Sequence, residues 1–179
     1  MRHITLITGG SRSGKSRFAL QQGEAHPGPH AFIATSPALD EEMKERIRRH
    51  REERGAHWRT VEEQTDLAGA LSQNASVPVV LVDCLTLWVN NLLYHDRAGK
   101  MTEDRVAEAS RALLAVAAEQ TGHLLLVTNE TGMGIMPGNA LARRFGDCAG
   151  RCNQVMASAA EQVVLMVAGL PVFVKGGTP

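Results

Sequence analysis

Short apolar runs alternate along this chain with longer segments in which apolar residues recur at helical spacing. Near-continuous apolar runs of four to seven residues are typical of strands buried on both faces of a parallel sheet. We therefore expect strands at residues 4–8, 30–35, 77–83, 124–129, 163–167 and 172–175. The segments between them predict helices at residues 15–23, 40–54, 64–72, 86–94, 102–119 and 139–159. This alternation predicts an α/β fold, with a mostly parallel sheet flanked by helices.

The predicted helix at residues 139–159 shows which of its faces should pack against the sheet. Its apolar side chains recur at three- and four-residue steps and form one stripe. The stripe consists of Leu141, Phe145, Cys148, Cys152, Val155, Met156 and Ala159. Since free cysteine is among the most buried residue types, we expect Cys148 and Cys152 to be core residues, with a redox or metal-binding role as the alternative.

Length and composition narrow the class of protein. The chain has 179 residues, so we expect one domain over residues 1–179. Hydrophobic residues make up 44% and charged residues 21%, which excludes a disordered or low-complexity chain. Lysines plus arginines and aspartates plus glutamates number 19 each, giving a formal net charge of zero. This balance argues against nucleic acid or an anionic membrane as partner and favours a small molecule.

Cysteine usage and the absence of targeting patterns indicate the compartment. The three cysteines form no disulfide framework and are not spaced as zinc ligands, so reduced thiols are expected. The first residues lack the pattern of a signal peptide. The longest apolar run, residues 163–174, is interrupted by Gly169 and Pro171 and is too short for a membrane helix. We expect a cytoplasmic protein with no membrane span.

A phosphate-binding motif directly follows the first predicted strand. Residues 9–16 match G-x-x-x-x-G-K-[ST], and a predicted helix begins at once. In such a loop the glycines let the backbone wrap a phosphate, and the helix N-terminus adds partial positive charge. Lys15 would reach the β- and γ-phosphates, and Ser16 would coordinate Mg²⁺. The binding residues expected here are Gly9, Gly10, Ser11, Arg12, Ser13, Gly14, Lys15 and Ser16.

A carboxylate is expected beside the phosphate loop. The third predicted strand ends in Asp83, and open α/β sheets bind ligands at the carboxyl ends of their strands. Asp83 is therefore a candidate ligand of Mg²⁺, and a role as N-cap of the next helix is also open. Thr35 and Ser36 follow the second predicted strand at the same edge. Asn129 and Glu130 follow the fourth, and each of these four residues could equally serve a turn or a cap.

One histidine stands out in the predicted helix at residues 40–54. That helix is densely charged, and most of its charges should lie in solvent as i, i+4 pairs. Met43, Ile47, His50 and Arg54 nevertheless fall in one narrow sector, on the face that should pack against the domain. A buried histidine and arginine need polar partners, which a phosphate would supply. His50 is thus a candidate nucleophile or phosphate-binding residue, and a satisfied structural histidine is the alternative.

Four collinear segments together resemble a known family. They read TGGSRSGKSRFA, FIATSPALDEEMKERIRRHREERGAHWRTVEE, VLVDCLTLWVNNLL and LLLVTNETGMGIMPGNALARRFGDCAGRCNQ. The set looks like the bifunctional adenosylcobinamide kinase / adenosylcobinamide-phosphate guanylyltransferase family of cobalamin biosynthesis, and the similarity covers nearly the whole chain. The resemblance implies a phosphate-loop fold related to RecA, and a homo-oligomer, with trimers known in the family.

The resemblance also implies two reactions. A nucleoside triphosphate, ATP or GTP, first phosphorylates the aminopropanol hydroxyl of adenosylcobinamide. The enzyme then takes GMP from GTP onto a histidine, releases pyrophosphate, and passes the guanylyl group to adenosylcobinamide phosphate. The guanylylated histidine falls on His50, which here follows Arg49, where some relatives carry a second histidine. Lys15 would offset charge on the phosphates in both reactions.

The family pattern implies further nucleotide contacts beyond the phosphate loop. They fall on Ala34, Thr35, Ser36, Arg51, Glu52, Glu53, Arg54, Glu62 and Asp83. Glu62 has a chemical rationale, because a carboxylate can accept hydrogen bonds from the N1–H and exocyclic amine of guanine. Adenine does not present these donors in that arrangement, so Glu62 would favour GTP.

Two other functions remain open from the residues. Another small P-loop kinase or NTPase would use Lys15 and Asp83, would keep His50 as a structural residue, and would form no covalent nucleotide. A nucleotide-sensing module without turnover would use the charged helix as a partner surface. The residues themselves identify neither the corrinoid nor the base of the kinase step.

Overall fold

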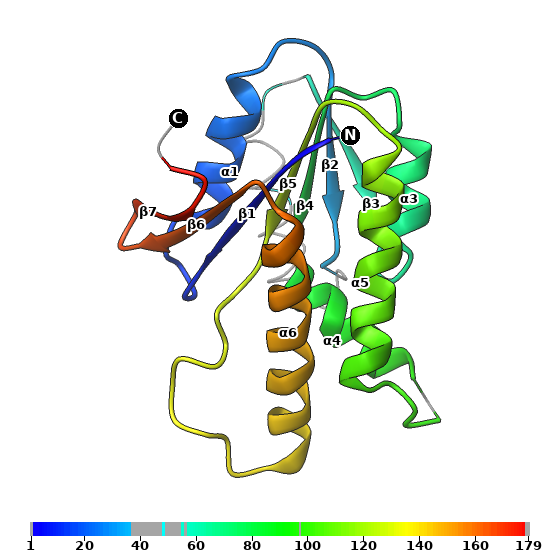
Figure 1. Ribbon diagram of the computed structural model, residues 1–179, viewed down its shortest axis with the longest axis vertical. Coiled ribbons are helices and arrows are strands. Elements are labelled where there is room, and N and C mark those ends of the chain that lie inside the picture. The colour runs from blue at the N-terminus through cyan, green and yellow to red at the C-terminus, as the bar shows by residue number, and fades with distance from the viewer. Residues whose placement is uncertain (1, 37–47, 49–54, 56, 97, 178–179) are drawn as a thin grey trace.

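The computed structural model describes residues 2–36, 48, 55, 57–96 and 98–177. Within this part of the chain, seven strands form one sheet in the order β3-β2-β4-β5-β1-β6-β7 (Figure 1). The strands are β1 (His3–Gly9), β2 (His30–Ala34), β3 (Trp58–Glu62), β4 (Val79–Asp83), β5 (His123–Val127), β6 (Gln162–Val167) and β7 (Leu170–Lys175). All neighbouring pairs are parallel except β6 and β7, which form an antiparallel hairpin.

Helices cover both faces of the sheet. They are α1 (Lys15–Glu24), α3 (Leu67–Gln73), α4 (Leu85–His95), α5 (Glu103–Ala118) and α6 (Ala140–Ala159). Helix α1 packs on one face, against β1, β4 and β5, and α3, α4, α5 and α6 pack together on the other (Figure 1). The predicted α/β fold with a mostly parallel sheet is confirmed. None of the described helices is long and apolar enough to cross a membrane.

Successive residues of the central strands enter two separate cores. In β1, Leu6 packs among the side chains of the larger helical layer, whereas Ile7 packs beneath α1. In β4, Val80 likewise faces the larger helical layer and Leu81 faces α1, and both are fully buried. Burial on both faces is therefore the physical reason for the continuous apolar runs.

One strand, β3, was missed by the hydrophobic pattern. It lies at the edge of the sheet, where only one neighbour pairs with it. Trp58 is buried, but Arg59 and Glu62 are exposed, so the strand carries no apolar run. An edge strand needs only a partly apolar face, and its signal in the sequence is correspondingly weak. The helix predicted at residues 40–54 lies outside the described residues, apart from Arg48.

Helix α6 confirms the predicted buried stripe only in its middle turns, at Cys148, Cys152 and Met156. Cys148 and Cys152 are buried in the core, as expected. The prediction was wrong for Leu141, which is 69% exposed, and for Ala159, which is also exposed. Leu141 belongs to the first turn of α6, and the start of this helix extends beyond the strand ends (Figure 1). Asn153 is buried instead, and its polar atoms are all hydrogen-bonded.

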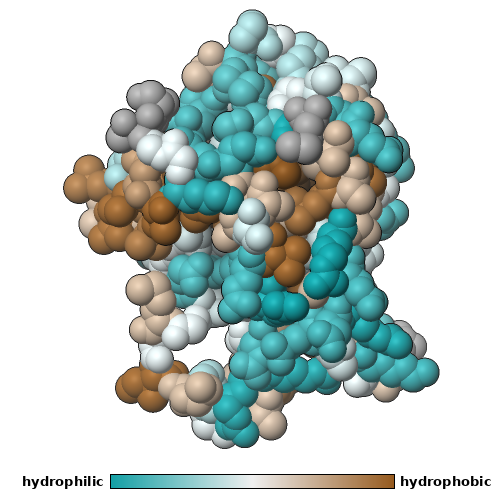
Figure 2. All heavy atoms as spheres, in the orientation of Figure 1, coloured by the Kyte–Doolittle hydropathy of each residue, from teal (hydrophilic) through white to brown (hydrophobic). Residues whose placement is uncertain are grey.

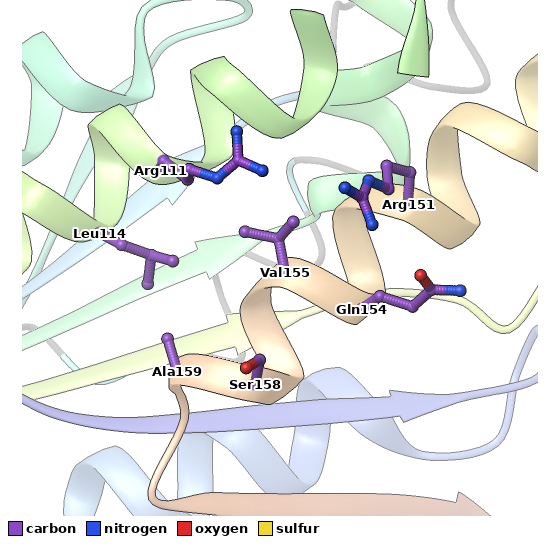
Figure 3. A pocket seen from close by; sticks show the side chains of 7 residues that line it. All are labelled: Arg111, Leu114, Arg151, Gln154, Val155, Ser158 and Ala159. Atoms are coloured by element: carbon purple, nitrogen blue, oxygen red, sulfur yellow. The ribbon is translucent and has the colours of Figure 1, made fainter. Parts of the chain in front are cut away.

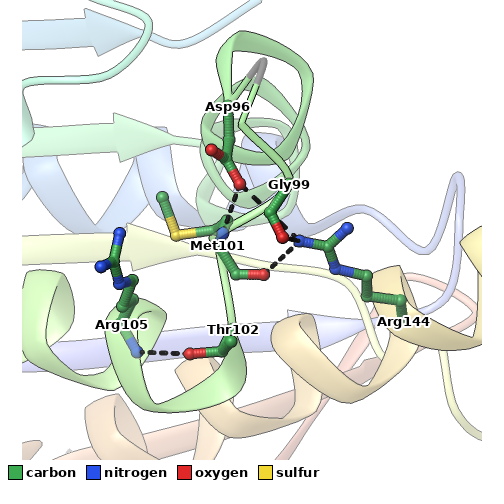
Figure 4. A network of polar contacts seen from close by, with 6 residues as sticks. All are labelled: Asp96, Gly99, Met101, Thr102, Arg105 and Arg144. Carbon is green, nitrogen blue, oxygen red and sulfur yellow. Dashed lines mark hydrogen bonds and ion pairs between the residues drawn. The ribbon is translucent and has the colours of Figure 1, made fainter.

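A polar network fixes the connection between α4 and α5 against α6 (Figure 4). Arg144 of α6 donates to the carbonyl oxygens of Gly99, at 3.2 Å, and of Met101. Its guanidinium also lies 3.7 Å from the carboxylate of Asp96, which accepts the backbone N–H of Met101. One arginine thereby bonds to three residues of the described part of this connection.

Histidines gather at the amino-terminal edge of the sheet. The ring of His123 stacks on that of His26 with centroids 3.6 Å apart, and the ring of His3 lies 5.8 Å from it. His30 is 2% exposed, and its ring lies 4.9 Å from that of His57. Burial is the main cause that lowers the pKa of both His30 and His123, and neighbouring histidines lower it further. Burial therefore favours the neutral imidazole of His30 and of His123.

We expect the free energy of unfolding to fall as the pH is lowered from about 7.5 to about 5.5. The unfolded chain binds protons at His30 and His123 near the ordinary histidine pKa of about 6.5, whereas the folded chain takes them up only at lower pH. Urea unfolding at several pH values measures this fall. Replacing both residues by glutamine should flatten the curve. A flat wild-type curve would contradict the assignment.

Candidate active site

A cleft of about 880 Å³ opens at the carboxyl edge of the sheet, on the α1 face. The strand registers join in one row of Cα partners, which runs Ile7, Val127, Asp83, Ala34, Glu62 across β1, β5, β4, β2 and β3. Neighbouring strands lie about 4.8 Å apart, so this row brings their ends side by side beneath the cleft. The cleft is lined by Ser11, Arg12, Ser13, Gly14, Lys15, Ser16, Arg17, Leu20, Gln21, Glu24, Phe32, Ala34, Ser36, Thr60, Asp83, Cys84, Leu87, Val127 and Asn129.

The loop between β1 and α1 forms one wall of the cleft and requires glycine at two points. Gly9 has φ +147°, and a Cβ atom there would lie 2.5 Å from the carbonyl oxygen of Met166 in β6. Gly14 has φ +94° and is the N-cap of α1, with no side chain bonded to the helix end. The first amide groups of α1 are therefore left to bind an anion.

Lys15 places a cation inside this loop. Its side chain is 7% exposed, and its ammonium group donates to the carbonyl oxygen of Gly10 and lies 3.4 Å from the hydroxyl of Ser13. Burial lowers the pKa of Lys15, and the nearby negative charge of Asp83 opposes this shift. A third ammonium donor has no partner within the described residues, so it is available to an anionic ligand.

The β6–β7 hairpin supports the loop from behind. Ala168 and Gly169 form its turn with φ of +50° and +84°, a pair of positive values that suits a tight hairpin turn. The backbone N–H of Gly169 donates to the carbonyl oxygen of Ser13 at 3.0 Å. A Cβ atom on Gly14 would lie only 3.3 Å from Cα of Gly169, so loop and turn are in close contact. The sequence analysis did not foresee this contact, because it joins segments distant in the chain.

Asp83 is held at the opposite wall by a neighbouring threonine. The backbone N–H of Thr35 donates to the carbonyl oxygen of Asp83 at 3.1 Å. The Thr35 hydroxyl accepts the N–H of Cys84 at 2.7 Å and donates to the Cys84 carbonyl oxygen at 2.8 Å. Cys84, rather than Asp83, is the N-cap of α4. The Asp83 carboxylate is thereby left to face the cleft.

Two oxygen-bearing side chains that could bind a divalent cation border the same cleft. Ser16 and Asp83 both line it, and both are partly exposed. Among the described residues, no group of three or more histidine, cysteine, aspartate or glutamate side chains could hold a metal ion. This donor set fits Mg²⁺, which one or two protein oxygens commonly hold together with phosphates and water.

Most of the predicted binding residues are brought to this cleft. Those that line it are Ser11, Arg12, Ser13, Gly14, Lys15, Ser16, Ala34, Ser36 and Asp83. Gly9 and Gly10 form the start of the loop, and Glu62 pairs with Ala34 in the strand register. Ser36 has a buried hydroxyl oxygen with no partner within the described part of the chain. An unpaired buried oxygen in a cleft wall is a donor or acceptor available to a ligand.

Other predicted residues lie away from the cleft or cannot be placed. Thr35 is fully buried, and its hydroxyl bonds to Cys84 instead of facing the cleft. His50 and the run Arg51, Glu52, Glu53 and Arg54 lie outside the described residues.

Several lining residues were not foreseen. Arg17, Leu20, Gln21 and Glu24 recur at i, i+3, i+4 and i+7 on α1, so helical spacing from Arg17 could have found them. Thr60 belongs to the missed strand β3, and its position depends on strand pairing. Asn129, which the sequence analysis placed at this edge without a role, lines the cleft as well.

A second hollow, of about 370 Å³, lies between α5 and α6 on the opposite face of the sheet (Figure 3). Its lining residues are Arg111, Leu114, Arg151, Gln154, Val155, Ser158 and Ala159. Figure 3 shows the two arginines on either side of Val155. No carboxylate and no glycine-rich loop borders this hollow, so the cleft at the carboxyl edge is the candidate active site.

Comparison with known proteins shows what this chain is similar to. The model of the family described as cobinamide kinase / cobinamide phosphate guanyltransferase matches residues 5–174. The bifunctional adenosylcobalamin biosynthesis protein CobP of Pseudomonas aeruginosa is 45% identical over 172 residues, covering 96% of each chain. The proteins named CobU of Escherichia coli and Salmonella typhimurium are 42% and 41% identical, covering 96% of this chain and 99% of theirs.

Thr35→Val should lower the free energy of unfolding by about 1–3 kcal/mol, because it leaves the buried N–H of Cys84 without a partner. The Cys84 carbonyl oxygen also loses one hydrogen bond but keeps that from the N–H of Trp88 at 3.1 Å. Urea unfolding measures this loss. Thr35→Ser keeps the hydroxyl and should retain most of the stability. Equal losses in the two variants would mean that the methyl group, rather than the hydrogen bonds, matters at this position.

Proposed function

This chain belongs to the cobinamide kinase / cobinamide phosphate guanyltransferase family, and from that membership we propose that the cleft at the phosphate loop serves both of its reactions. The protein is a transferase of cobalamin biosynthesis with kinase and guanylyltransferase activities. Its substrates are nucleotides and a corrinoid. The observation that supports a shared site is that the glycine-rich loop, Lys15 and Asp83 line one cleft.

In the kinase reaction, the aminopropanol hydroxyl of adenosylcobinamide attacks the γ-phosphorus of a nucleoside triphosphate, ATP or GTP. The new bond joins the hydroxyl oxygen to phosphorus, the bond from phosphorus to the β-phosphate oxygen breaks, and a proton is released. The nucleoside diphosphate leaves with the bonding electrons. Catalysis of this kind depends mainly on positioning and on offsetting charge. The loop amides and the buried ammonium of Lys15 supply both.

In the transferase reaction, a neutral imidazole of His50 attacks the α-phosphorus of GTP, and pyrophosphate leaves. The phosphate of adenosylcobinamide phosphate then attacks the same phosphorus, which gives adenosylcobinamide-GDP and restores the histidine. An imidazole with an ordinary pKa near 6.5 is mostly neutral at pH 7, as this attack requires. Ser36, with its unpaired buried hydroxyl, lines the cleft just before the segment that carries His50. This position supports the assignment.

Mg²⁺ would be held by Ser16 and Asp83 and would offset charge on the phosphate oxygens in both reactions. Both side chains line the same cleft, and the charge of Asp83 acts on Lys15, the neighbour of Ser16, which supports a shared cation site. Lys15 neutralises the same phosphates from inside the loop, and burial strengthens its electrostatic effect.

The guanine base would lie toward the β2–β3 side of the cleft. Glu62 ends β3 and pairs in register with Ala34, two strands from Asp83. With the triphosphate in the loop, a nucleotide laid along the strand ends would bring its base to Glu62. The carboxylate would accept the N1–H and exocyclic amine of guanine there. Arg51, Glu52, Glu53 and Arg54 follow His50 and complete the proposed contacts.

Incubation with Mg²⁺ and α-labelled GTP, followed by denaturation, should leave an acid-labile and alkali-stable label on the protein. We expect the label to disappear in His50→Ala and to fall by at least about 100-fold in Lys15→Ala, since Lys15 acts on the phosphates. His95→Ala, at an exposed position remote from the cleft, is the matched control and should label like the wild type. Absence of label from a preparation that binds GTP would favour a P-loop kinase with a structural His50.

We further propose that the protein is a homo-oligomer, such as the trimer that the resemblance implies, and that its subunits meet through the β6–β7 hairpin. One face of β7 exposes Leu170, Val172 and Val174 by 69%, 49% and 65%. Figure 2 shows an apolar patch over this hairpin and a smaller one on the loop that carries Met133 and Ile135. An apolar edge strand of this kind is usually covered by another chain.

Sedimentation velocity should show an oligomer for the wild type. The double substitution Val172→Glu and Val174→Glu should dissociate it, because two charges would be buried at the interface. Ala115→Glu, on the exposed face of α5, is the control and should leave the sedimentation coefficient unchanged. A monomeric wild type at micromolar concentration would refute this proposal.

A further inference from the structure

Asn129 lies between the two parts of the phosphate site. Strand β5 is the neighbour of both β1 and β4, and its Val127 pairs with Ile7 on one side and Asp83 on the other. The backbone pairing with β1 continues past the strand end, since the N–H of Glu130 donates to the carbonyl oxygen of Gly9 at 3.2 Å. Asn129 is two residues beyond Val127, so both side chains point to the same face, and both line the cleft.

The backbone of Asn129 is fixed from both sides by buried side chains. Its N–H donates to the hydroxyl of Thr86 in α4 at 2.7 Å, and its carbonyl oxygen accepts from the amide of Asn153 in α6 at 3.1 Å. Thr86 and Asn153 are 7% and 9% exposed, and Thr128 lies within hydrogen-bond distance of both. Such a buried and fully bonded network rigidifies the segment that it holds.

The same network reaches the start of the phosphate loop. Glu130 accepts hydrogen bonds from the hydroxyl of Thr8 at 2.7 Å and from the amide of Asn153 at 3.2 Å. Thr8 directly precedes Gly9, the first residue of the loop. The position of Asn129 is therefore tied to the position of the loop as well as to the end of β4 through Thr86.

The side chain of Asn129, by contrast, has no hydrogen-bond partner within the described residues. An asparagine after a strand commonly bonds to its own backbone as a turn or cap residue. Here the turn is held by Thr86 and Asn153, and the Asn129 amide is left facing the cleft. A rigid backbone with an unused amide donor is the arrangement expected of a ligand contact.

Building on the proposed function, we infer that the amide of Asn129 donates a hydrogen bond to the γ-phosphoryl group during the kinase reaction. The triphosphate end held by Lys15 lies over β1, and Asn129 is about one strand spacing to the side, toward Asp83. As the hydroxyl oxygen bonds to the γ-phosphorus and the bond to the β-phosphate oxygen breaks, charge shifts among the γ-phosphoryl oxygens. An aligned neutral donor stabilises that charge, and the proton of the hydroxyl is released to solvent. Thr86 and Asn153 are positioning residues that hold Asn129.

A contact between Asn129 and the γ-phosphate would affect the two reactions differently. In the guanylyl transfer, bonds change at the α-phosphorus, and the γ-phosphate remains part of the departing pyrophosphate. A contact confined to the γ-phosphate should therefore matter much more for the kinase reaction than for guanylylation. In each variant, the rate of guanylylation therefore serves as the internal control for the rate of the kinase reaction.

The test compares Asn129→Ala and Asn129→Asp with the wild type in three assays. These are the steady-state kinase rate, single-turnover labelling by α-labelled GTP, and GDP affinity by calorimetry. We expect Asn129→Ala to lower kinase kcat about 100-fold, as for the loss of one aligned donor to a transition state. Asn129→Asp should lower it at least as much, because a carboxylate repels phosphate. Labelling and GDP affinity should change by less than about threefold in Asn129→Ala.

Thr86→Val tests the positioning role, because it removes the acceptor of the Asn129 N–H and keeps the shape of the side chain. It should lower kinase kcat by about 10-fold through misplacement of Asn129, with KM for the nucleotide unchanged. Ser110→Ala is the matched control, since Ser110 is also a fully buried hydroxyl but lies on α5 outside the cleft. It should leave kinase kcat unchanged.

A kinase kcat within about threefold of wild type in folded Asn129→Ala would overturn the inference, as would equal losses in kinase rate and labelling. A different result, full kinase and guanylylation activity in Lys15→Ala, would reject the proposed function itself. Loss in Lys15→Ala together with full kinase activity in Asn129→Ala would reject only the role of Asn129.

Discussion

The site depends on the register of the parallel strands. Ile7, Val127, Asp83, Ala34 and Glu62 are successive Cα partners, so strands that are distant in sequence end along one line. Parallel pairing also brings every loop that follows these strands to the same edge. The order of the strands then sets the order of the site residues along this edge. The phosphate loop follows β1, Asn129 follows β5, Asp83 ends β4, and Ser36 follows β2. A shift of one residue in any pairing would turn a cleft residue to the opposite face.

The phosphate loop itself is an unfavourable structure that its neighbours stabilise. It contains residues with positive φ, including the non-glycine Arg12 at +56°, and it encloses a buried ammonium. Such conformations persist only where contacts with neighbouring residues stabilise them. Here β6 lies against Gly9, and the β6–β7 turn bonds to Ser13. The hairpin that braces the loop also exposes the apolar face proposed to join subunits, so subunit contact and loop geometry would be mechanically linked.

The sequence predicted those features that local patterns encode. The buried strands were found because both of their faces are apolar, and the phosphate loop because its glycines and lysine are adjacent in the chain. Strand β3 was missed, since an edge strand such as the one that carries Thr60 and Glu62 needs no apolar run. Thr35 illustrates a different limit. Its hydroxyl suggested a ligand contact, yet the structure uses it to hold Cys84, and only the pairing of β2 with β4 reveals that partner.

The strand order gives the cleft two unlike ends, and this asymmetry explains how one site could serve two reactions. In our proposal the triphosphate tail lies over β1 and β5, and the base lies over β2 and β3. The α-phosphorus would then face the β2 side, where the segment of His50 leaves the sheet after Ser36, and the γ-phosphorus would face Asn129. The nucleotide need not move between the two reactions. The corrinoid hydroxyl would attack the γ-phosphorus from one side of the cleft, and His50 would attack the α-phosphorus from the other. A rigid network at the γ-end, built from Thr86 and Asn153, fits this division, since it orients one phosphate without constraining the other.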